Sequence, residues 1–365
     1  MDRVDHFGRD LFVALDRAGG RPLRSQLEEQ LRDGVRSGRL HAGTALPPTR
    51  ALAAELGIAR GVVVEAYGQL VAEGFLVARR GSATRVARVA APEPRTTTPA
   101  TRMPPARFDF RAESADRGAF PRRAWLAAAR RAMTVAPDAD LGYGTWAGAP
   151  ALRGALAAYL GRARGVVAEP EQVVVTAGIT QAVALLAAVL RRRGARKVIV
   201  EEPGFDQHRT ILERAGLSLV PIEVDDGGLR TGELPAAAAA LVTPAHQMPT
   251  GAVLAPERRA ALLDWAAAND ALVLEDDYDG EYRYDREPVG ALQGLGAGRV
   301  VYLGSTSKTL APALRLGWMV LPGDLAAVLA DERGWTDGGS PVLDQLTLAA
   351  FIERGELDRH LRRMR

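Results

Sequence analysis

The chain has 365 residues, of which 47% are hydrophobic and 25% charged, and it carries a formal net charge of +3 with no cysteine. This length accommodates two or more domains, and the lack of cysteine excludes disulfides and thiolate metal sites and suits a reducing compartment. The first residues are charged rather than apolar, and apolar runs such as residues 182–190 are too short to span a bilayer, so we expect a soluble, cytoplasmic protein without a membrane partner.

Positive charge is concentrated near the N-terminus, where residues 1–88 hold 14 arginines and 10 acidic residues. By itself this excess is weak support for nucleic-acid binding. Leu27, Leu31 and Val35 recur at helical spacing, which predicts a helix over residues 23–38.

Two further helices are predicted before residue 75. After a pair of prolines, Thr49 is a candidate N-cap for a short helix over residues 50–56. Another helix is predicted over residues 59–73, and Gly74 marks its end. Its buried face is expected to consist of Val63, Ala66, Tyr67 and Leu70.

A basic hairpin is predicted after these helices, from residues 75–78 and 83–86, with Arg79-Arg80-Gly81-Ser82 at its tip. Together the elements make a winged helix-turn-helix, here assigned to residues 11–87. Arg60 opens its second helix, where a recognition helix meets base edges, while the wing arginines reach phosphate or the minor groove. A helix-turn-helix can also serve only as an oligomerisation module, but arginines on both DNA-facing surfaces favour DNA binding.

Residues 20–87 contain the motifs Leu46-Pro-Pro-Thr-Arg50, Leu52-Ala53, Ala66-Tyr67, Glu73-Gly74 and Gly81-Ser82. In these motifs and their spacing, the segment resembles the GntR family of bacterial regulators. Ala59 and Gly61 flank Arg60 where the family often has hydroxyl residues, which removes possible phosphate contacts. The resemblance and the two basic surfaces give six candidate DNA contacts: Thr49, Arg50, Arg60, Arg79, Arg80 and Gly81.

Residues 88–107 are rich in proline, threonine and alanine, which predicts an extended linker between two independently folded units. Beyond them, short apolar runs alternate with helical patterns. This alternation predicts an α/β domain with a mostly parallel sheet, covered on both faces, that binds ligands at the carboxyl ends of its strands. Seven strands are expected, at residues 173–176, 198–201, 217–222, 240–243, 271–274, 300–303 and 318–321.

Lys308 is the leading candidate for a reactive residue. The chain has only two lysines, Lys197 and Lys308, although arginine is abundant. A desolvated lysine can lose its proton and form an imine with an aldehyde, which arginine cannot do. Lys308 follows a predicted buried strand, in a polar loop, whereas Lys197 stands at a strand entrance and is expected to be solvated.

Other predicted strand ends carry groups suited to one flat, phosphorylated ligand. The turn at Gly178 and Ile179 precedes a helix, whose free amides form an anion cradle. Phe205 offers an aromatic face, and Asp276 offers a carboxylate that can hold a ring nitrogen protonated. The candidate phosphate donors around the reactive lysine are Ser305, Ser307 and Arg315. A phosphate, a flat ring with a basic nitrogen and an aldehyde together describe pyridoxal 5′-phosphate.

Residues 108–365 look like fold-type I aminotransferases, and the whole chain resembles the MocR/GabR subfamily of GntR regulators. The resemblance implies that Lys308 forms the internal aldimine, that Asp276 pairs with the pyridinium and that Tyr278 lies beside the phenolic oxygen. It also implies that Phe205 stacks on the cofactor ring. The phosphate cup that it implies consists of Gly178, Ile179, Ser305, Ser307 and Arg315. Tyr143 matches a tyrosine that reaches the phosphate of the neighbouring subunit, so a homodimer is expected.

Two positions depart from the aminotransferase pattern. Met248 stands where transaminases carry an asparagine that bonds the phenolic oxygen, and a methionine donates no such bond. Ile179 replaces a hydroxyl residue. The resemblance also implies a further segment of roughly a hundred residues with an arginine for a substrate carboxylate, so the aminotransferase-like part is expected to be C-terminally truncated.

These departures favour a regulator over an enzyme. The first hypothesis is a transcription regulator whose aminotransferase-like part binds pyridoxal phosphate, with an amino compound as effector, and alters how a dimer binds operator DNA. Two alternatives stay open: a working transaminase with an attached DNA-binding module, and a DNA-binding fragment with an impaired sensor.

Overall fold

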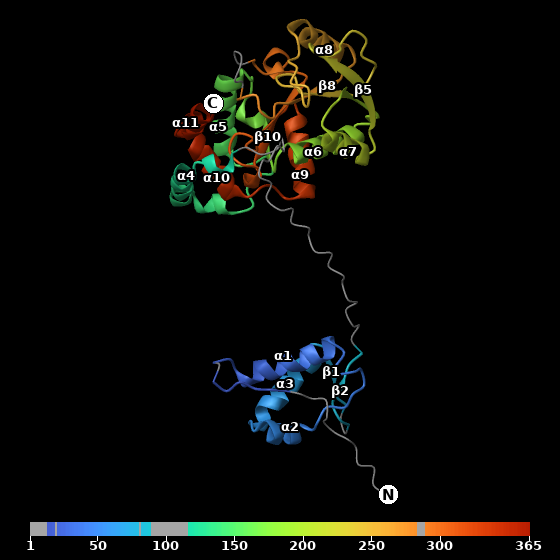
Figure 1. Ribbon diagram of the computed structural model, residues 1–365, viewed down its shortest axis with the longest axis vertical. Helices are drawn as coiled ribbons and strands as arrows, with labels where there is room; N and C mark the ends of the chain where they lie inside the picture. Colours follow the sequence, from blue (N-terminus) through green and yellow to red (C-terminus); the bar gives the residue numbers. More distant parts are fainter. Residues whose placement is uncertain (1–12, 19, 80–81, 89–115, 283–288) are drawn as a thin grey trace, which may run out of the picture. The chain divides into compact units, whose positions relative to one another are not determined.

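The computed structural model divides into two compact units, Met1–Arg107 and Phe108–Arg365 (Figure 1). It describes residues 13–18, 20–79, 82–88, 116–282 and 289–365. Within these segments, no helix combines the length and the apolar character that crossing a lipid bilayer requires.

In the described part of the N-terminal unit, three helices precede a short antiparallel hairpin, as predicted. Leu76 stands opposite Val86 in the hairpin. The elements are α1 (Leu23–Arg36), α2 (Thr49–Leu56), α3 (Arg60–Ala72), β1 (Leu76–Val77) and β2 (Arg85–Val86).

One hydrophobic cluster holds these elements together. Leu27 and Leu31 of α1 pack in it with Val63 and Leu70 of α3, and all four side chains are buried. Tyr67 donates its hydroxyl hydrogen to the carbonyl of Pro47, at 3.1 Å, and so links α3 to the loop that precedes α2. The buried face predicted for residues 59–73 is therefore confirmed in α3.

The prediction that Thr49 caps α2 is wrong. Pro48 holds the N-cap position with φ −55°, and Thr49 is the first helical residue, without a side-chain capping bond. The proline ring fixes φ near this value and defines the chain direction into the helix without a capping hydroxyl. The Thr49 hydroxyl is instead available to α3.

The larger unit is built on a mixed sheet, which has eight strands within the described residues, in the order β3-β10-β9-β8-β7-β4-β5-β6. The strands β9, β8, β7, β4 and β5 run parallel, whereas β10 runs antiparallel to both β9 and β3. The bounds are β3 (Val173–Thr176), β4 (Lys197–Glu202), β5 (Ser218–Asp225), β6 (Gly228–Leu229), β7 (Ala239–Val242), β8 (Leu272–Asp276), β9 (Val300–Ser305) and β10 (Gly317–Val320). The seven predicted strands are present, and β6 is a two-residue addition at the edge, too short to show an alternating pattern.

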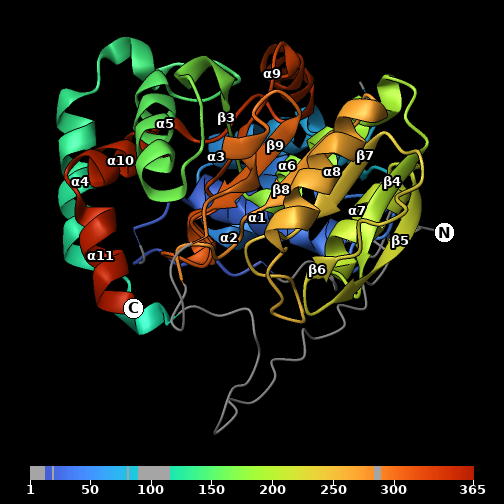
Figure 2. The ribbon, with the colours of Figure 1, turned by 90° about the horizontal axis from the view of Figure 1, so that it is seen from above.

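Helices cover both faces of this sheet. Figure 2 shows α4, α5, α10 and α11 gathered at one side, with α8 lying across the strands. The helices are α4 (Arg122–Val135), α5 (Pro150–Arg164), α6 (Ile179–Arg192), α7 (Asp206–Arg214), α8 (Pro256–Ala268), α9 (Leu325–Thr336), α10 (Val342–Glu353) and α11 (Glu356–Met364).

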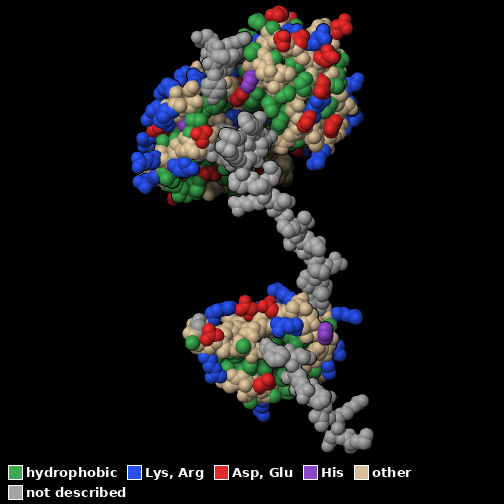
Figure 3. Space-filling view, in the orientation of Figure 1, with side chains coloured by type: hydrophobic (Ala, Val, Ile, Leu, Met, Phe, Trp, Pro, Cys, Tyr) green, Lys and Arg blue, Asp and Glu red, His purple; other side chains and the backbone are tan. Residues whose placement is uncertain are grey.

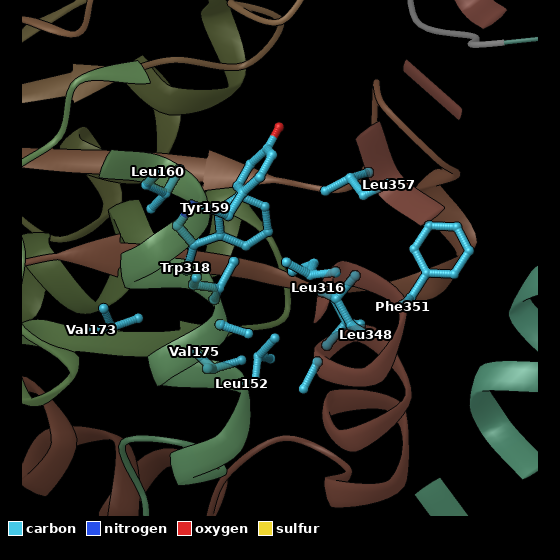
Figure 4. Packing of buried hydrophobic residues seen from close by; sticks show 14 of the residues in the cluster. Leu152, Tyr159, Leu160, Val173, Val175, Leu316, Trp318, Leu348, Phe351 and Leu357 are labelled. Atoms are coloured by element: carbon cyan, nitrogen blue, oxygen red, sulfur yellow. The ribbon is translucent and has the colours of Figure 1, made fainter. Parts of the chain in front are cut away.

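The strand residues explain why both faces are covered. Successive side chains of a strand point to opposite faces. Val173 and Val175 of β3 accordingly pack in one cluster with α5 and α10, including Phe351 (Figure 4). Val174 packs in a second cluster with α6 and α9. Strands that are apolar on both faces are typical of a sheet between two helical layers.

The sheet order brings several strand ends to one edge. Because β10 is antiparallel to both of its neighbours, β3 points the same way as β9. The carboxyl ends of β3, β9, β8, β7 and β4 therefore lie along one edge, where α/β sheets bind ligands.

Candidate functional site

A cavity of about 290 Å³ lies at this edge of the sheet. Nine of the ten predicted cofactor residues line it: Gly178, Ile179, Phe205, Asp276, Tyr278, Ser305, Ser307, Lys308 and Arg315. Residues far apart in the sequence thus meet in one place.

One part of the cavity is suited to an anion. α6 begins at Ile179 after Gly178, whose φ of 111° favours glycine. The first amides of a helix have no partner within the helix and bind anions. The Arg315 guanidinium lies 3.6 Å from the position that a Cβ would take on Gly178, so it flanks the same helix end.

Two serines from the end of β9 complete this part of the lining. Ser305 is buried, and the Ser307 amide donates to its Oγ at 3.3 Å. Hydroxyls, helix amides and a guanidinium are the donors by which proteins hold phosphate. The donor set therefore fits a phosphate group.

Asp276 supplies a buried carboxylate at the end of β8. Within the described residues its Oδ1 has no hydrogen-bond partner, and its Oδ2 lies 3.5 Å from His208 Nδ1. Burial, together with the charges of Asp277 and Glu201, raises the pKa of Asp276 well above its usual range. Burial also lowers the pKa of His208 to about 4. His208 is therefore neutral near pH 7, so this contact is not an ion pair. The unsatisfied Oδ1 of Asp276 fits a protonated ring nitrogen, whose positive charge would stabilise the ionised carboxylate against the effect of burial.

Phe205 and His208 form an aromatic pair on the cavity wall. Their ring centroids lie 4.9 Å apart with an interplanar angle of 85°. His208 was not predicted from the sequence, although its spacing of three residues from Phe205 at the start of α7 places the two on one helix face. Four other lining residues were also not predicted: Thr180, Gln207, Thr243 and Pro312.

A buried carboxylate joins two loops that line the cavity. Glu201 accepts bonds from the amide of Thr243 at 3.1 Å, from its hydroxyl at 2.5 Å and from Gln247 Nε2 at 3.1 Å. Gln247 Nε2 also donates, at 2.8 Å, to a carbonyl of the loop that carries Phe205. The same residue precedes Met248, which lines the cavity from the other loop. This network fixes the distance between the two walls.

Lys308 stands in the turn between β9 and the short 3-10 helix η5 (Pro312–Leu314), and its side chain is half-buried. Its ammonium charge opposes the increase in the pKa of Asp276 that burial causes. The charges of Lys308 and Asp276 therefore interact within the same cavity.

Tyr143 does not line the cavity of its own chain. Its side chain is 99% exposed and lies between the 3-10 helix η2 (Asp138–Leu141) and α5. Its expected role at the phosphate of a neighbouring subunit stays a prediction.

The predicted DNA contacts gather at the starts of α2 and α3. Arg60, the first residue of α3, donates through Nε to Thr49 Oγ1 at 3.4 Å. Arg50, Arg60 and Arg79 are exposed, and Figure 3 shows basic side chains at several points on the visible face of this unit. Val64, four residues after Arg60 on the same helix face, is an apolar side chain at 46% exposure that the sequence analysis did not single out.

Two of the predicted wing contacts, Arg80 and Gly81, lie outside the described residues.

Both units match known families. Residues 23–86 match the bacterial regulatory proteins of the gntR family, and residues 114–364 match aminotransferase class I and II. Among solved structures, the kynurenine aminotransferase of Pyrococcus horikoshii, in complex with PMP, is similar, with a TM-score of 0.62 and 27% identity. The match covers 69% of this chain and 65% of that one, so this chain spans slightly less than two thirds of the enzyme's length.

Curated relatives extend across both units. The chain is 38% identical to the probable rhizopine catabolism regulatory protein MocR of Rhizobium meliloti, over 97% of this chain and 76% of that protein. It is 36% identical to the pyridoxine biosynthesis transcriptional regulator PdxR of Corynebacterium glutamicum, over 98% of this chain and 78% of that protein. The chain therefore belongs to the MocR-type transcription regulators, in which a GntR helix-turn-helix precedes an aminotransferase-like domain.

Proposed function

We propose that this regulator binds pyridoxal 5′-phosphate in the cavity of its aminotransferase-like unit and uses it to sense an amino compound. The observation that carries the proposal is one cavity that combines the unsatisfied carboxylate of Asp276, the amine of Lys308 and the Arg315-flanked start of α6. When bound, this cofactor supplies an aldehyde that condenses reversibly with primary amines.

Each side chain has a definite task in this proposal. Arg315, Ser305 and the first amides of α6 hold the phosphate, and Asp276 holds a proton on the ring nitrogen. Phe205 packs against the flat ring, and Lys308 provides the primary amine that fixes the cofactor. The PMP in the similar kynurenine aminotransferase supports this assignment, because PMP is the amine form of the same cofactor.

Met248 favours sensing over turnover. It lines the cavity, and its thioether offers no hydrogen-bond donor for the phenolic oxygen. The curated relatives named above are regulators, which agrees with this preference. We therefore propose that the cavity binds an amine effector beside Lys308 and does not carry out a complete transamination.

We further propose that the regulator acts as a homodimer. Tyr143, fully exposed on its own chain, then reaches the phosphate site of the second subunit. A ligand changes DNA affinity only if it binds one dimer arrangement better than another. Arg50, Arg60 and the wing would contact the operator.

The proposal is tested by titrating the purified chain with pyridoxal phosphate, reducing it with borohydride and mapping the modified residue. A new absorbance band and a pyridoxyl group on Lys308 are expected. No band, or a label on Lys197, would contradict the proposal. Adding amino acids then separates sensor from transaminase, because turnover converts the cofactor to its amine form, whereas a sensor keeps it as an imine.

A further inference from the structure

The carbonyl group of Thr309, the residue after Lys308, accepts hydrogen bonds from two distant parts of the larger unit. Nε2 of His360, in α11, lies 2.8 Å from this oxygen, and Tyr282 donates its hydroxyl hydrogen to it over 3.2 Å. A carbonyl oxygen has two lone pairs, so it accepts both bonds at once. Tyr282 belongs to the loop after β8 that also carries Tyr278. α11 and this loop therefore meet at the turn that holds the lysine.

The ring of His360 is the donor in its contact, because a carbonyl oxygen only accepts hydrogen bonds. The ring hydrogen is therefore on Nε2. The His360 side chain is buried, and burial lowers its pKa, whereas the bond to Thr309 opposes this change. Near pH 7 the ring is thus neutral, and its single N–H is committed to the Thr309 carbonyl.

The lysine turn also has hydrogen bonds of its own. The Leu310 amide donates to the Thr306 carbonyl at 2.8 Å, and the Thr306 amide donates to the Leu316 carbonyl at 3.0 Å. These bonds join residues that are near in the sequence, so they give the turn its shape. The two bonds to Thr309 instead fix the turn relative to α11 and the loop after β8. Lys308 lies within the turn, so its place in the cavity depends on this anchoring.

Apolar contacts hold α11 against the same turn. Leu357 and Leu361 of α11 are buried, and they belong to the same hydrophobic cluster as Leu310 of the turn. The helix thus brings both apolar contacts and one hydrogen bond to the turn. A substitution of His360 that keeps the side-chain length should therefore remove the bond and leave the helix in place.

We propose that His360 and Tyr282 are positioning residues that hold the turn through the Thr309 carbonyl, so that the amine of Lys308 is presented to the cavity. This inference rests on the proposed function, in which Lys308 fixes the cofactor. Neither His360 nor Tyr282 is among the described residues that line the cavity, so both act through the turn and not on the cofactor itself.

The first test locates the ring hydrogen and needs no cofactor. Long-range proton–nitrogen NMR reports which nitrogen of a histidine is protonated. The chain has five histidines, and the signals that disappear in His360→Gln identify this ring. Near pH 7 we expect a hydrogen on Nε2 and none on Nδ1. A ring with its hydrogen on Nδ1 would overturn the inference.

The second test compares the affinities of two forms of the cofactor. Pyridoxal phosphate reacts with the amine of Lys308, whereas PMP, its amine form, has no aldehyde for that reaction. Methionine and glutamine are similar in length, but only glutamine offers an N–H donor in place of Nε2. His360→Met should weaken the binding of pyridoxal phosphate by about three- to tenfold, as expected for one lost hydrogen bond, and leave PMP affinity unchanged. His360→Gln should retain both affinities.

Three further variants separate positioning of the lysine from a general effect on the fold. Tyr282→Phe removes only the hydroxyl group and should also weaken pyridoxal phosphate binding without changing PMP affinity. In a Lys308→Ala background, His360→Met should change neither affinity, because no amine is left to position. His41→Met, at an exposed histidine of the N-terminal unit, is the matched control and should behave as the wild type does.

The pair of ligands also distinguishes the ways in which the inference can fail. An equal loss of affinity for both ligands in His360→Met would show that His360 serves the fold and not the lysine. An unchanged affinity for pyridoxal phosphate in this variant would likewise overturn the inference, while the proposed function stands. If the wild-type chain binds neither ligand, the proposed function fails and the inference fails with it.

Discussion

The two lysines form a natural pair for testing the reactive residue. Lys308 lines the cavity, whereas Lys197 is exposed at the start of β4. Lys308→Ala should abolish the pyridoxyl label that borohydride reduction fixes on the protein, because arginine and the other cavity groups form no imine. DNA binding by the N-terminal unit should persist in a gel-shift assay. Lys197→Ala should label as the wild type does, and an unchanged label in Lys308→Ala would show that another residue reacts.

Arg60 is the sharpest test of the DNA face. It opens α3, is exposed and donates through Nε to Thr49 Oγ1 at 3.4 Å. If it makes a bidentate contact with a base, Arg60→Ala should weaken specific binding by about 1–3 kcal/mol in a fluorescence titration. Arg21→Ala, an exposed arginine paired with Glu29, serves as the control. An equal loss on every DNA sequence would place Arg60 on phosphate instead.

His208 should make stability depend on pH. Burial lowers its pKa from 6.5 to about 4, so the folded protein keeps it neutral while the unfolded chain protonates it below pH 6.5. The free energy of unfolding of the larger unit therefore has its full value above pH 6.5. It falls as the pH decreases toward 4, by up to about 3 kcal/mol. Urea unfolding near pH 7 and pH 5 should show a smaller loss for His208→Gln than for wild type. Equal losses would exclude this histidine as the cause.

At the scale of an element, the start of α6 depends on one glycine. Gly178 has φ 111° and ψ 172°, a region that side chains rarely adopt. Gly178→Ala should destabilise the unit by about 1–3 kcal/mol in denaturant unfolding and weaken the uptake of pyridoxal phosphate. Gly154→Ala, inside α5 with open space at the Cβ position, should be neutral or slightly stabilising. Full retention of both properties in Gly178→Ala would contradict the phosphate assignment.

The elements also show what the sequence could predict and why. Strands such as β3 were predictable because three of its four residues are valines, which suits burial on two faces. β6 was not predictable, because a strand of two residues shows no alternating pattern. The cap of α2 was not predictable either, because Pro48 takes the N-cap position and Thr49 becomes the first helical residue. In the site, Asp276 ends β8 and Lys308 follows β9, each in a recognisable motif. His208 and Gln247 act through partners from distant segments, Asp276 and Glu201, and only the folded chain reveals these contacts.

At the scale of the whole molecule, the two units have different tasks. The N-terminal unit carries Arg50 and Arg60 at the starts of α2 and α3. The larger unit carries the cavity. Linkage requires that if pyridoxal phosphate changes DNA affinity, DNA changes cofactor affinity by the same factor. In the dimer that we propose, Tyr143 would make each cofactor site depend on the second subunit, which would provide a route for such coupling.

The most direct measurement is the affinity of the chain for a duplex selected from a random DNA pool, with and without pyridoxal phosphate, in wild type and Lys308→Ala. We predict that the cofactor changes the wild-type dissociation constant by about fivefold or more, the lower range of typical allosteric coupling. We expect no change in the variant. The same affinity with and without the cofactor in wild type, at concentrations that label Lys308, would contradict the claim that this domain is the sensor.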